Sequence, residues 1–321
     1  MSFKGSNIFI TGINGFVGSV AAEYFLNGGA HVIGLVKDRN KKTRLDILDR
    51  CSIVYGDIQD KGVLDYILSK YEVDYVLHLA AQPIVRICNN DPFMAYSTNV
   101  MGTVNLLESC RTKIVKPKKI IVMTSDKAYG PHEKLPYVED SPLTTFDSYC
   151  TSKSCQDMVA RSYAMTYDLP VVVVRAGNLY GPGDLNTSRL IPRSIIRLLG
   201  GQSPVLYGGV DEYIREFIYV DDVVSAYCTL LEKGDNGQAY NVGGSTPQKI
   251  GEVIFKIRDL INSEIEVKVE KSGFSEINAQ YLDASKLEKL GWSISIDLDE
   301  GLTRSIKWYS EYLNSGGVSC L

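Results

Sequence analysis

Short runs of aliphatic and β-branched residues alternate along this chain with longer segments in which apolar residues recur at helical spacing. The short runs predict strands at Asn7–Thr11, Ala30–Val36, Ser52–Tyr55, Tyr75–Leu79, Lys119–Thr124 and Pro170–Arg175. The longer segments predict helices, chiefly at Val17–Leu26, Gly62–Lys70, Ala95–Arg111 and Ser148–Tyr167. Strands rich in Val and Ile that alternate with helices are typical of an α/β fold, a doubly wound parallel sheet covered on both faces.

The pattern changes at about residue 177, where longer loops with Gly-Pro and Gly-Gly pairs begin. The last third of the chain mixes short helices and strands and ends in an amphipathic segment from Asp299 to Leu313. We therefore expect an N-terminal domain over residues 1–176, to which the chain returns around 215–245. A smaller C-terminal α/β domain is expected over residues 177–321.

Composition narrows the class of protein. With 45% hydrophobic and 22% charged residues, the 321-residue chain is globular rather than disordered. The net charge is −4 and Lys and Arg are scattered, which argues against a nucleic-acid partner. The sequence shows neither a long uncharged apolar run nor a signal peptide, so we expect a soluble cytoplasmic protein without a membrane partner. Seven cysteines without a CxxC pair, and only three histidines, argue against disulfides and a metal site.

The first predicted strand runs into a glycine-rich loop, TGINGFVG at residues 11–18, which leads into the first predicted helix. Gly12 would let the chain turn sharply, Gly15 would let the backbone approach a pyrophosphate, and Gly18 would let the helix pack on the strand. The helix N-terminus then offers N–H groups and positive potential to the phosphates. This loop predicts a dinucleotide-binding site, which would also be lined by Asn14, Phe16 and Val17.

The end of the second predicted strand bears on which dinucleotide is bound. Proteins that bind NAD place a carboxylate there, on the adenosine ribose, but here Val36 is followed by Lys37 and Arg39. Two cations suit a 2′-phosphate, so we expect NADP; NAD stays open if Asp38 binds the ribose. Asp57, just past the third strand, is expected to reach the adenine amino group.

Tyr149 and Lys153 lie four residues apart on a predicted helix, so their side chains share one face. A nearby ammonium lowers the pKa of a tyrosine, and a phenolate can take a proton from a sugar hydroxyl. Ser125, just past the strand Lys119–Thr124, would hold the same hydroxyl. We therefore predict that Ser125, Tyr149 and Lys153 are catalytic, and that Tyr149 and Lys153 also contact the cofactor.

Further motifs follow one another along the chain: GDI (56–58), HLAAQPIV (78–85), NVMGT (99–103), TSDKAYG (124–130), YCTSK (149–153), RAGNLYGPG (175–183) and REFIYVDD (215–222). With them the chain resembles, over nearly its whole length, the extended short-chain dehydrogenase/reductases, specifically their nucleotide-sugar epimerase/dehydratase group. The resemblance implies a Rossmann domain that holds NAD(P) and a C-terminal domain that holds a nucleoside-diphosphate sugar. It also implies a homodimer formed through the helices after Pro92 and around Tyr149.

The same resemblance implies further contacts to the cofactor and to the sugar nucleotide. Asn178 and Arg215 would hold the diphosphate, the arginine by bidentate contact. Cys88 stands where many relatives have a serine near the sugar hydroxyls, and Arg86 is nearby. The segment from Arg189 would complete this site, with Leu190 to Arg193 lining the base pocket. The additional cofactor contacts implied are Ile58, Leu79, Ala80, Ala81 and Asn99.

Asp126 and Lys127 directly follow Ser125, and this is where the resembling 4,6-dehydratases carry an acid and a base that simple 4-epimerases do not need. Asp126 would protonate the departing 6-hydroxyl, a role suited to a desolvated carboxyl with a raised pKa. Lys127 stands where those dehydratases have a glutamate. It would remove the C5 proton only in its neutral form, or would otherwise stabilise the enolate.

We therefore expect an enzyme, an NADP-dependent nucleotide-sugar dehydratase that oxidises C4 transiently and eliminates water. UDP-N-acetylglucosamine is the leading substrate and CDP-glucose the second, with a 4-keto-6-deoxy or a 5,6-ene sugar as the product. One alternative is a 4-epimerase, or an enzyme acting on a 4-keto or 5,6-ene intermediate. An alternative of another class is a non-catalytic dinucleotide-sensing regulator, against which the intact Tyr149 and Lys153 pair argues.

Overall fold

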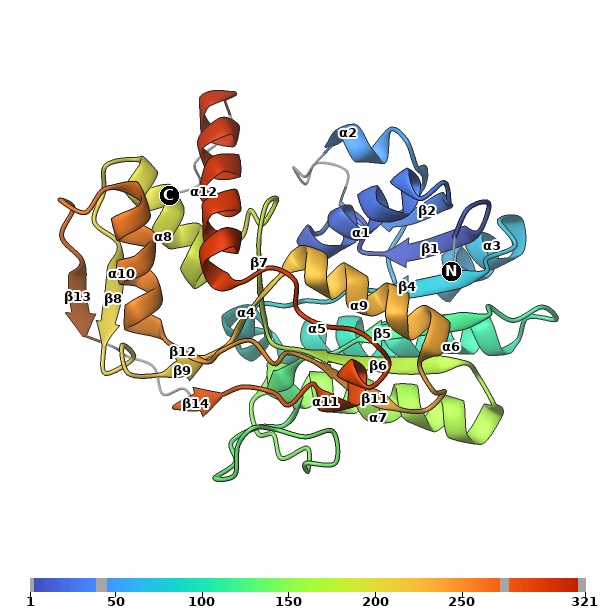
Figure 1. Ribbon diagram of the computed structural model, residues 1–321. Coiled ribbons are helices and arrows are strands. Elements are labelled where there is room, and N and C mark those ends of the chain that lie inside the picture. Colours follow the sequence, from blue (N-terminus) through green and yellow to red (C-terminus); the bar gives the residue numbers. More distant parts are fainter. Residues whose placement is uncertain (1–2, 39–44, 272–276, 317–321) are drawn as a thin grey trace.

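The computed structural model describes residues 3–38, 45–271 and 277–316. Its centre is a seven-stranded sheet, parallel throughout, in the order β3-β2-β1-β4-β5-β6-β11 (Figure 1). The strands are β1 (Asn7–Thr11), β2 (His31–Val36), β3 (Ser52–Tyr55), β4 (Tyr75–His78), β5 (Lys119–Met123), β6 (Val171–Ala176) and β11 (Ala239–Val242). The first six match the predicted strands to within one residue at each end. The order is that of a doubly wound Rossmann sheet, as expected.

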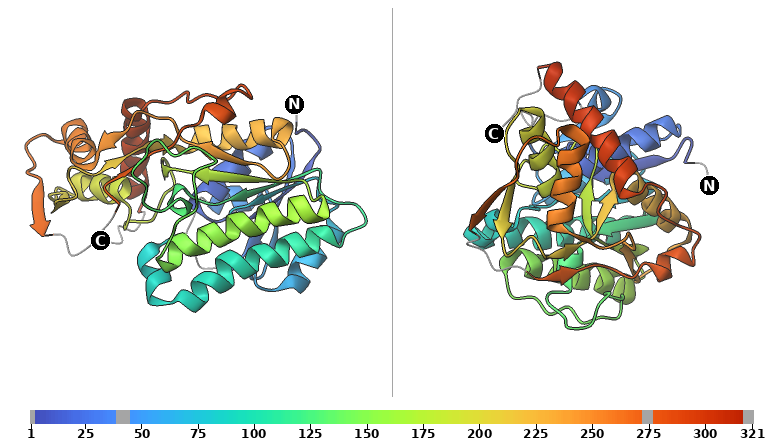
Figure 2. Two further views of the ribbon diagram at one scale, coloured as in Figure 1. Left: turned by 90° about the horizontal axis from the view of Figure 1, so that it is seen from below. Right: turned by 60° about the vertical axis from the view of Figure 1, so that its left-hand side comes forward.

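Helices cover both faces of this sheet (Figure 2). One face carries α1 (Phe16–Asn27), α2 (Leu45–Leu48), α9 (Val220–Lys233) and α11 (Ser285–Glu288). The other face carries α3 (Lys61–Lys70), α6 (Gly102–Arg111) and α7 (Ser148–Tyr167). Alternate strand residues supply the two cores, since Ile8 and Ile10 of β1 join the first and Phe9 joins the second. This two-sided burial explains why the strands are apolar at nearly every position.

The segment predicted as one helix, Ala95–Arg111, consists of three consecutive elements. They are α5 (Pro92–Tyr96), a π-helical turn η1 (Ser97–Met101) and α6, and the short helix α4 (Val85–Asn90) precedes them. Asn99 is buried within the π-helical turn. Single π-turns inside helices are frequent at functional sites.

The C-terminal elements gather beside one end of the sheet (Figure 1). Three small sheets pair β7 (Asn178–Tyr180) with β10 (Phe217–Tyr219), β8 (Val205–Gly208) with β13 (Lys268–Lys271), and β9 (Ile214–Arg215) with both β12 (Gln248–Lys249) and β14 (Ala279–Gln280). The helices are α8 (Leu190–Leu199), α10 (Ile250–Ile261) and α12 (Leu298–Asn314), which share an apolar core. The chain enters this region after β6 and returns to the sheet through α9 and β11. The proposed domain boundary at residues 176 and 177 stays a prediction.

Helix α7 begins and ends at polar caps that set the position of its first turns. Asp147 accepts hydrogen bonds from the backbone N–H groups of Tyr149 and Cys150, at 3.0 and 3.1 Å. The helix ends at Asp168, whose φ of 51° lies in the left-handed region. Tyr149 therefore lies in the first turn, with Lys153 one turn later on the same face.

Within the described part of the chain, no helix combines the length and the apolar character needed to cross a membrane. The His, Cys, Asp and Glu residues of the same ranges form no group of three that could hold a metal ion.

Candidate active site

The glycine loop joins β1 to α1 with two close backbone approaches. Gly12 has a φ of 70°, and a Cβ there would lie 3.0 Å from the Ala80 backbone. A Cβ on Gly18 would lie 2.3 Å from the Gly12 carbonyl oxygen, so α1 starts this close to the loop only with glycine at that position. Gly15 caps α1 without a side-chain hydrogen bond, which leaves the first helical N–H groups for an anion. This loop fits the pyrophosphate of a dinucleotide.

The loop after β4 is held against the glycine loop. Thr11 Oγ1 accepts hydrogen bonds from the backbone N–H groups of Leu79 and Ala80, both at 3.1 Å. The remaining sequence-predicted cofactor residues of this region lie in the segments that follow β1, β3 and β4: Asn14, Phe16, Val17, Ile58 and Ala81. All of them therefore lie beyond the carboxyl ends of the strands, where ligands bind in open α/β sheets.

Asn99 connects this region to helix α7. Its Oδ1 accepts a hydrogen bond from the Gln82 backbone N–H at 2.8 Å, and its Nδ2 donates to the Ser152 hydroxyl at 2.9 Å. The Ser152 hydroxyl in turn donates to the Tyr149 carbonyl at 2.7 Å. Asn99 thus fixes the loop after β4 against the first turn of α7, and its role as a cofactor contact stays a prediction.

Lys37 and Asp57, expected at the adenosine end of the cofactor, bind each other. The Lys37 ammonium lies 2.7 Å from the Asp57 carboxylate. Although partial burial opposes it, the hydrogen bonds from Lys37 and from the Gln59 backbone lower the pKa of Asp57. Arg39, the second cation expected here, lies outside the described residues. Lys37 is therefore already neutralised by a carboxylate, a contact that sequence reasoning did not predict.

Ser125, Asp126 and Lys127 form a tight turn directly after β5. Asp126 begins a short 3₁₀ helix, η2 (Asp126–Ala128), and is almost fully buried. The Ser125 hydroxyl donates to Asp126 Oδ1 at 2.9 Å, whereas Oδ2 has no hydrogen-bond partner among the described residues. Burial raises the pKa of Asp126, although the charges of Lys127 and Arg215 oppose the rise. A carboxyl with a raised pKa keeps its proton to higher pH than an exposed one, which suits a proton donor.

Tyr149 and Lys153 are both buried beside this turn. Burial raises the pKa of the Tyr149 phenol, and its hydrogen bond with Ser125 offsets part of the rise. Burial lowers the pKa of the Lys153 ammonium to about 8. The structure thus brings Ser125, Asp126 and Tyr149 together as the sequence predicted, with Lys153 on the same helix face. Their catalytic roles stay predictions.

Arg215, predicted to bind the diphosphate, lies close enough to Asp126 for its charge to lower the pKa of that carboxyl. Its guanidinium is buried and donates to the Ile277 carbonyl at 2.7 Å and to the Ile214 carbonyl at 2.9 Å. A hollow of about 470 Å³ is lined by residues 131–133, 135 and 277–279, Ile277 among them. The Asn178 amide donates to the Glu216 backbone carbonyl at 3.1 Å, so β7 is joined to the residue that follows Arg215.

Glu216 follows Arg215 in the sequence, and sequence reasoning gave it no role. It is fully buried between Gly177 and Gly243, where a Cβ would lie 2.9 and 2.6 Å from its carboxylate. Its two oxygens accept from the backbone N–H groups of Gly244 at 2.8 Å and Leu282 at 3.0 Å. Burial and the charge of Asp126 raise the pKa of Glu216. The carboxyl therefore joins three backbone segments behind the site; its presence in REFIYVDD was the available signal.

The other sugar-nucleotide candidates are less closely grouped. Arg189, which precedes Leu190 at the start of α8, binds Asp184 at 2.9 Å, and its guanidinium lies 5.9 Å from the Phe16 ring centroid. Cys88 is buried in α4 and clusters with Tyr149. Arg86 is exposed on the same short helix. Arg189 thus reaches the glycine loop and Cys88 reaches the catalytic helix, while no described contact connects Arg86 to the site.

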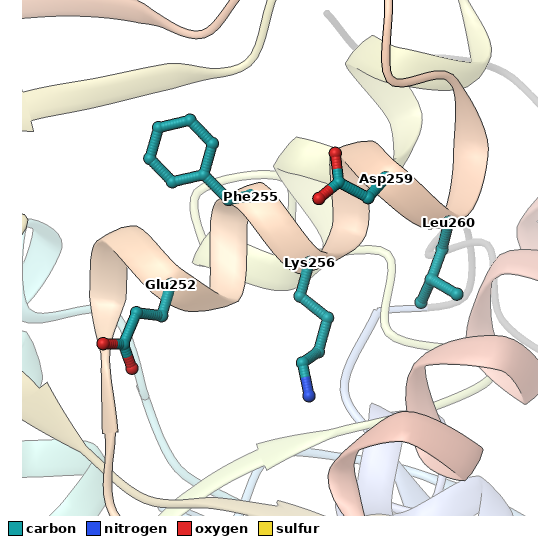
Figure 3. A pocket seen from close by; sticks show the side chains of 5 residues that line it. All are labelled: Glu252, Phe255, Lys256, Asp259 and Leu260. Carbon is teal, nitrogen blue, oxygen red and sulfur yellow. The ribbon is translucent and has the colours of Figure 1, made fainter.

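An open groove of about 470 Å³ lies on α10, at a distance along the chain from all of these residues (Figure 3). Its lining belongs to that helix alone: Glu252, Phe255, Lys256, Asp259 and Leu260. Because the groove contains no candidate site residue, we assign it no role in the site.

The model of the NAD dependent epimerase/dehydratase family matches residues 8–243, nearly three quarters of the chain. The chain belongs to this family. The match confirms the nucleotide-sugar epimerase/dehydratase family that the sequence predicted.

Individual family members that are similar to this chain include both dehydratases and epimerases. A trifunctional UDP-glucose 4,6-dehydratase, 3,5-epimerase and reductase of Arabidopsis thaliana is 29% identical over 97% of the chain, which spans about half of that relative, 48%. A UDP-glucose 4-epimerase of Thermotoga maritima, solved with UDP-glucose, has a TM-score of 0.90 and 27% identity, covering 96% of this chain and 99% of its own. A dTDP-glucose 4,6-dehydratase of Bacillus anthracis, solved with NAD, has a TM-score of 0.84 and 28% identity, covering 97% and 98%.

These relatives bear on two expectations from the sequence. The family is NAD-dependent and the Bacillus enzyme holds NAD, so nicotinamide-dinucleotide binding is supported while NADP gains no specific support. The named relatives act on UDP-glucose or dTDP-glucose, so the expected UDP-N-acetylglucosamine and CDP-glucose gain none either.

Proposed function

We propose that this protein is a nucleotide-sugar 4,6-dehydratase, an enzyme that removes water from a nucleoside-diphosphate hexose. The observation that carries the proposal is the state of Asp126: a buried carboxyl with a raised pKa and one oxygen free of hydrogen bonds among the described residues. A 4-epimerase moves protons only at the 4-hydroxyl and needs no second acid. A dehydratase needs one to convert the 6-hydroxyl into water.

The residues divide the proton transfers among themselves. Tyr149, in contact with Ser125, takes the proton of the sugar 4-hydroxyl as C4 is oxidised. The Lys153 ammonium, one turn later on the same helix face, would favour the phenolate by its charge. A bound nicotinamide dinucleotide would supply the two-electron oxidant for C4 and return the electrons at the end. The 4-ketone then acidifies the C5–H bond, so a modest base can break it.

Residues of the Ser125–Lys127 turn then carry out the elimination of water. Lys127, half-buried beside Asp126, takes the C5 proton or stabilises the enolate. The C5 electron pair forms the C5–C6 double bond, and the C6–O bond breaks as Asp126 protonates the departing oxygen, so that water leaves. Reduction at C6 and proton return to C5 give a 4-keto-6-deoxy sugar, and the reaction is redox-neutral overall. Reduction at C4 instead leaves the 5,6-ene sugar.

Glucose linked to UDP or dTDP is the proposed substrate. The relatives named above act on these two nucleotide sugars, according to their names. Arg215 supplies a buried guanidinium beside Asp126, which suits a diphosphate held next to the reacting sugar. UDP-N-acetylglucosamine and CDP-glucose, expected from the sequence, are compared in the same experiment.

The test is turnover of four sugar nucleotides by the purified protein with NAD in D₂O, read by mass spectrometry and proton NMR. UDP-glucose, dTDP-glucose, UDP-N-acetylglucosamine and CDP-glucose are supplied separately. We expect a product one water lighter from a UDP- or dTDP-hexose, and the NMR spectrum then distinguishes a 6-methyl ketone from a 5,6-ene. If the substrates change configuration at C4 and none of the four loses water, the proposed dehydratase activity is refuted.

The second candidate is a 4-epimerase, favoured by the close fit to the Thermotoga epimerase at a TM-score of 0.90. The replacement of a dehydratase glutamate by Lys127 points the same way. In that case Asp126 has no reaction to perform, and its amide variant epimerises as fast as the wild type.

We propose NAD as the cofactor, in place of the NADP expected from Lys37 and Arg39. Because Asp57 already neutralises Lys37 and adds its own negative charge, a 2′-phosphate would meet a carboxylate there. We expect titration calorimetry to show NAD binding at least about tenfold more tightly than NADP, ~1.4 kcal/mol. In Asp57→Asn the preference should narrow, because the freed ammonium can attract the phosphate. Equal or tighter binding of NADP by the wild type would contradict this assignment.

We also propose the homodimer expected from the sequence, formed through α5 to α7. The residues that support it are large apolar side chains exposed on these elements or just before α7: Phe93, Met101, Phe146, Met158 and Met165. Met158 and Met165 lie seven residues apart on α7 and so share one face. Exposed apolar patches of this kind mark association surfaces.

Two charges on that face should separate the protomers. The double variant Met158→Glu with Met165→Glu is expected to elute as a monomer in size-exclusion chromatography with light scattering, whereas the wild type elutes as a dimer. Ile114→Glu is the matched control, since this exposed apolar residue follows α6 in a loop outside the patch. A variant that stays dimeric would place the interface elsewhere.

A further inference from the structure

Gln156 is a fully buried amide on α7, three residues after Lys153. Its Oε1 accepts a hydrogen bond from Lys153 Nζ at 2.9 Å. The second acceptor of this ammonium is the Met123 backbone carbonyl at 3.3 Å. Gln156 therefore provides the shorter of the two hydrogen bonds that hold the lysine. Neither a glycine loop nor a Tyr-x-x-x-Lys pattern would have pointed to it.

The orientation of this amide is set from its other end. Gln156 Nε2 donates to Thr103 Oγ1, on α6, at 3.0 Å. The single hydroxyl proton of Thr103 is donated to the Asn99 carbonyl at 2.7 Å. Thr103 Oγ1 can therefore only accept from Gln156, which turns the amide oxygen toward Lys153.

His78 and Thr11 extend the same chain to the glycine loop. His78 Nε2 lies 2.8 Å from Thr103 Oγ1, and His78 Nδ1 lies 2.8 Å from Thr11 Oγ1. Because Thr103 has given its proton to a carbonyl, His78 Nε2 is the donor toward it. Thr11 Oγ1 accepts two backbone N–H groups, so its own proton goes to Nδ1. These bonds assign a neutral His78 with its proton on Nε2.

The described titratable groups that face Lys153 from neighbouring elements do not form an ion pair with its ammonium. Burial lowers the pKa of His78 on β4 to about 3, assisted by the lysine charge. Burial raises the pKa of Cys88 on α4. Both groups are therefore uncharged at neutral pH, and among the residues that the structure describes Gln156 is the side chain that stabilises the ammonium by a hydrogen bond.

We propose that Gln156 is a positioning residue for Lys153, oriented by a buried hydrogen-bond chain that runs from Thr11 through His78 and Thr103. The chain connects the end of β1, beside the glycine loop, to the lysine of the catalytic helix. This inference rests on the proposed function in so far as Lys153 takes part in catalysis. The hydrogen-bond geometry itself does not depend on the substrate.

A pair of substitutions with opposite expected signs tests the proposal. Gln156→Glu places a carboxylate against the ammonium and should raise the pKa of Lys153 by about 1 unit or more. Gln156→Leu removes the acceptor, which favours the neutral amine and should lower that pKa. The measurement is an NMR titration of protein labelled with ¹³C at the lysine Cε, with the Lys153 signal identified by its absence in Lys153→Arg. Shifts in the same direction, or no shift in either variant, would overturn the proposal.

A second pair tests the chain behind Gln156 and also serves if a Gln156 variant does not fold. Thr103→Val removes the hydroxyl, so the amide can rotate and present its NH₂ group to the lysine; the Lys153 pKa should fall. Thr103→Ser keeps the hydroxyl and should restore the wild-type titration. A wild-type titration in Thr103→Val would show that Thr103 does not orient Gln156.

The activity readout is the alkaline limb of the pH profile of kcat/KM, which should move with the Lys153 pKa in every variant. A purely structural lesion would lower activity at all pH values without moving the limb, and that result would overturn the positioning role. Absence of turnover with all four sugar nucleotides would instead refute the proposed function. The NMR titration, made on free protein, would still decide on Gln156.

Discussion

Asp126→Asn should lose the elimination of water while keeping its fold. An amide cannot deliver a proton to the 6-hydroxyl, so we expect dehydration to slow by about 10² to 10⁴-fold, the usual contribution of a positioned acid. Oxidation at C4 depends on Tyr149 rather than on Asp126, and NADH absorbance on substrate binding should therefore persist. Mass spectrometry of the product measures the loss of water directly. Retention of wild-type dehydration would remove Asp126 from the mechanism.

The same variant has an expected effect on stability. Because burial raises the pKa of Asp126, the folded state holds the proton more tightly than the unfolded state does. The carboxyl therefore costs no folding free energy below the ordinary carboxyl range near pH 4, and its cost grows as the pH rises toward the raised folded value. Asp126→Asn should be more stable than the wild type at pH 8, and the difference should vanish at pH 4. Thermal midpoints at the two pH values check this.

Arg175→Met should strongly destabilise the fold. Arg175 on β6 is buried and binds the buried Asp157 of α7 through two hydrogen bonds of 2.7 and 2.9 Å. It also donates to the Tyr129 hydroxyl at 2.9 Å and to the Glu139 carbonyl at 2.8 Å. Removing the guanidinium leaves Asp157 as an uncompensated buried charge, for which losses of about 3 to 5 kcal/mol are typical. Urea unfolding curves measure the difference in the free energy of unfolding.

The matched control removes both charges. Arg175→Met with Asp157→Leu leaves no isolated charge in the core, so the double variant should recover part of the stability lost by Arg175→Met. If the double variant instead loses, relative to the wild type, the sum of the losses measured for Arg175→Met and for Asp157→Leu alone, the pair is not coupled as the geometry indicates.

The sequence predicted the sheet well because strand and helix periodicities are local. Six of the seven strands were located to within one residue, and Ser148–Tyr167 was predicted with the bounds that α7 has. Tyr149 and Lys153 could be paired because they share one helix. Ser125 and Asp126 could be added because both follow a buried strand whose end lies at the ligand-binding edge of the sheet.

What the sequence did not reveal depends on contacts between distant segments. The Lys37 and Asp57 pair joins the ends of two neighbouring strands of the sheet, and these residues lie 20 positions apart in the chain. The chain that ends at Gln156 begins at Thr11, and no periodicity connects these two positions. The π-helical turn at Asn99 was also missed, because apolar spacing does not distinguish a local widening from a continuous helix.

The edge strand β11 has a consequence for synthesis of the chain. It pairs with β6 in the register Ala239 to Val173 and Val242 to Ala176, although about sixty residues separate the two strands. Until β11 has been translated, the nascent polypeptide carries β6, with its four consecutive valines, as an unpaired sheet edge. Such edges invite intermolecular strand pairing and aggregation. During synthesis the chain is therefore open to strand pairing with other molecules until β11 joins the sheet, and a fragment of residues 1–176 would keep this exposed edge permanently.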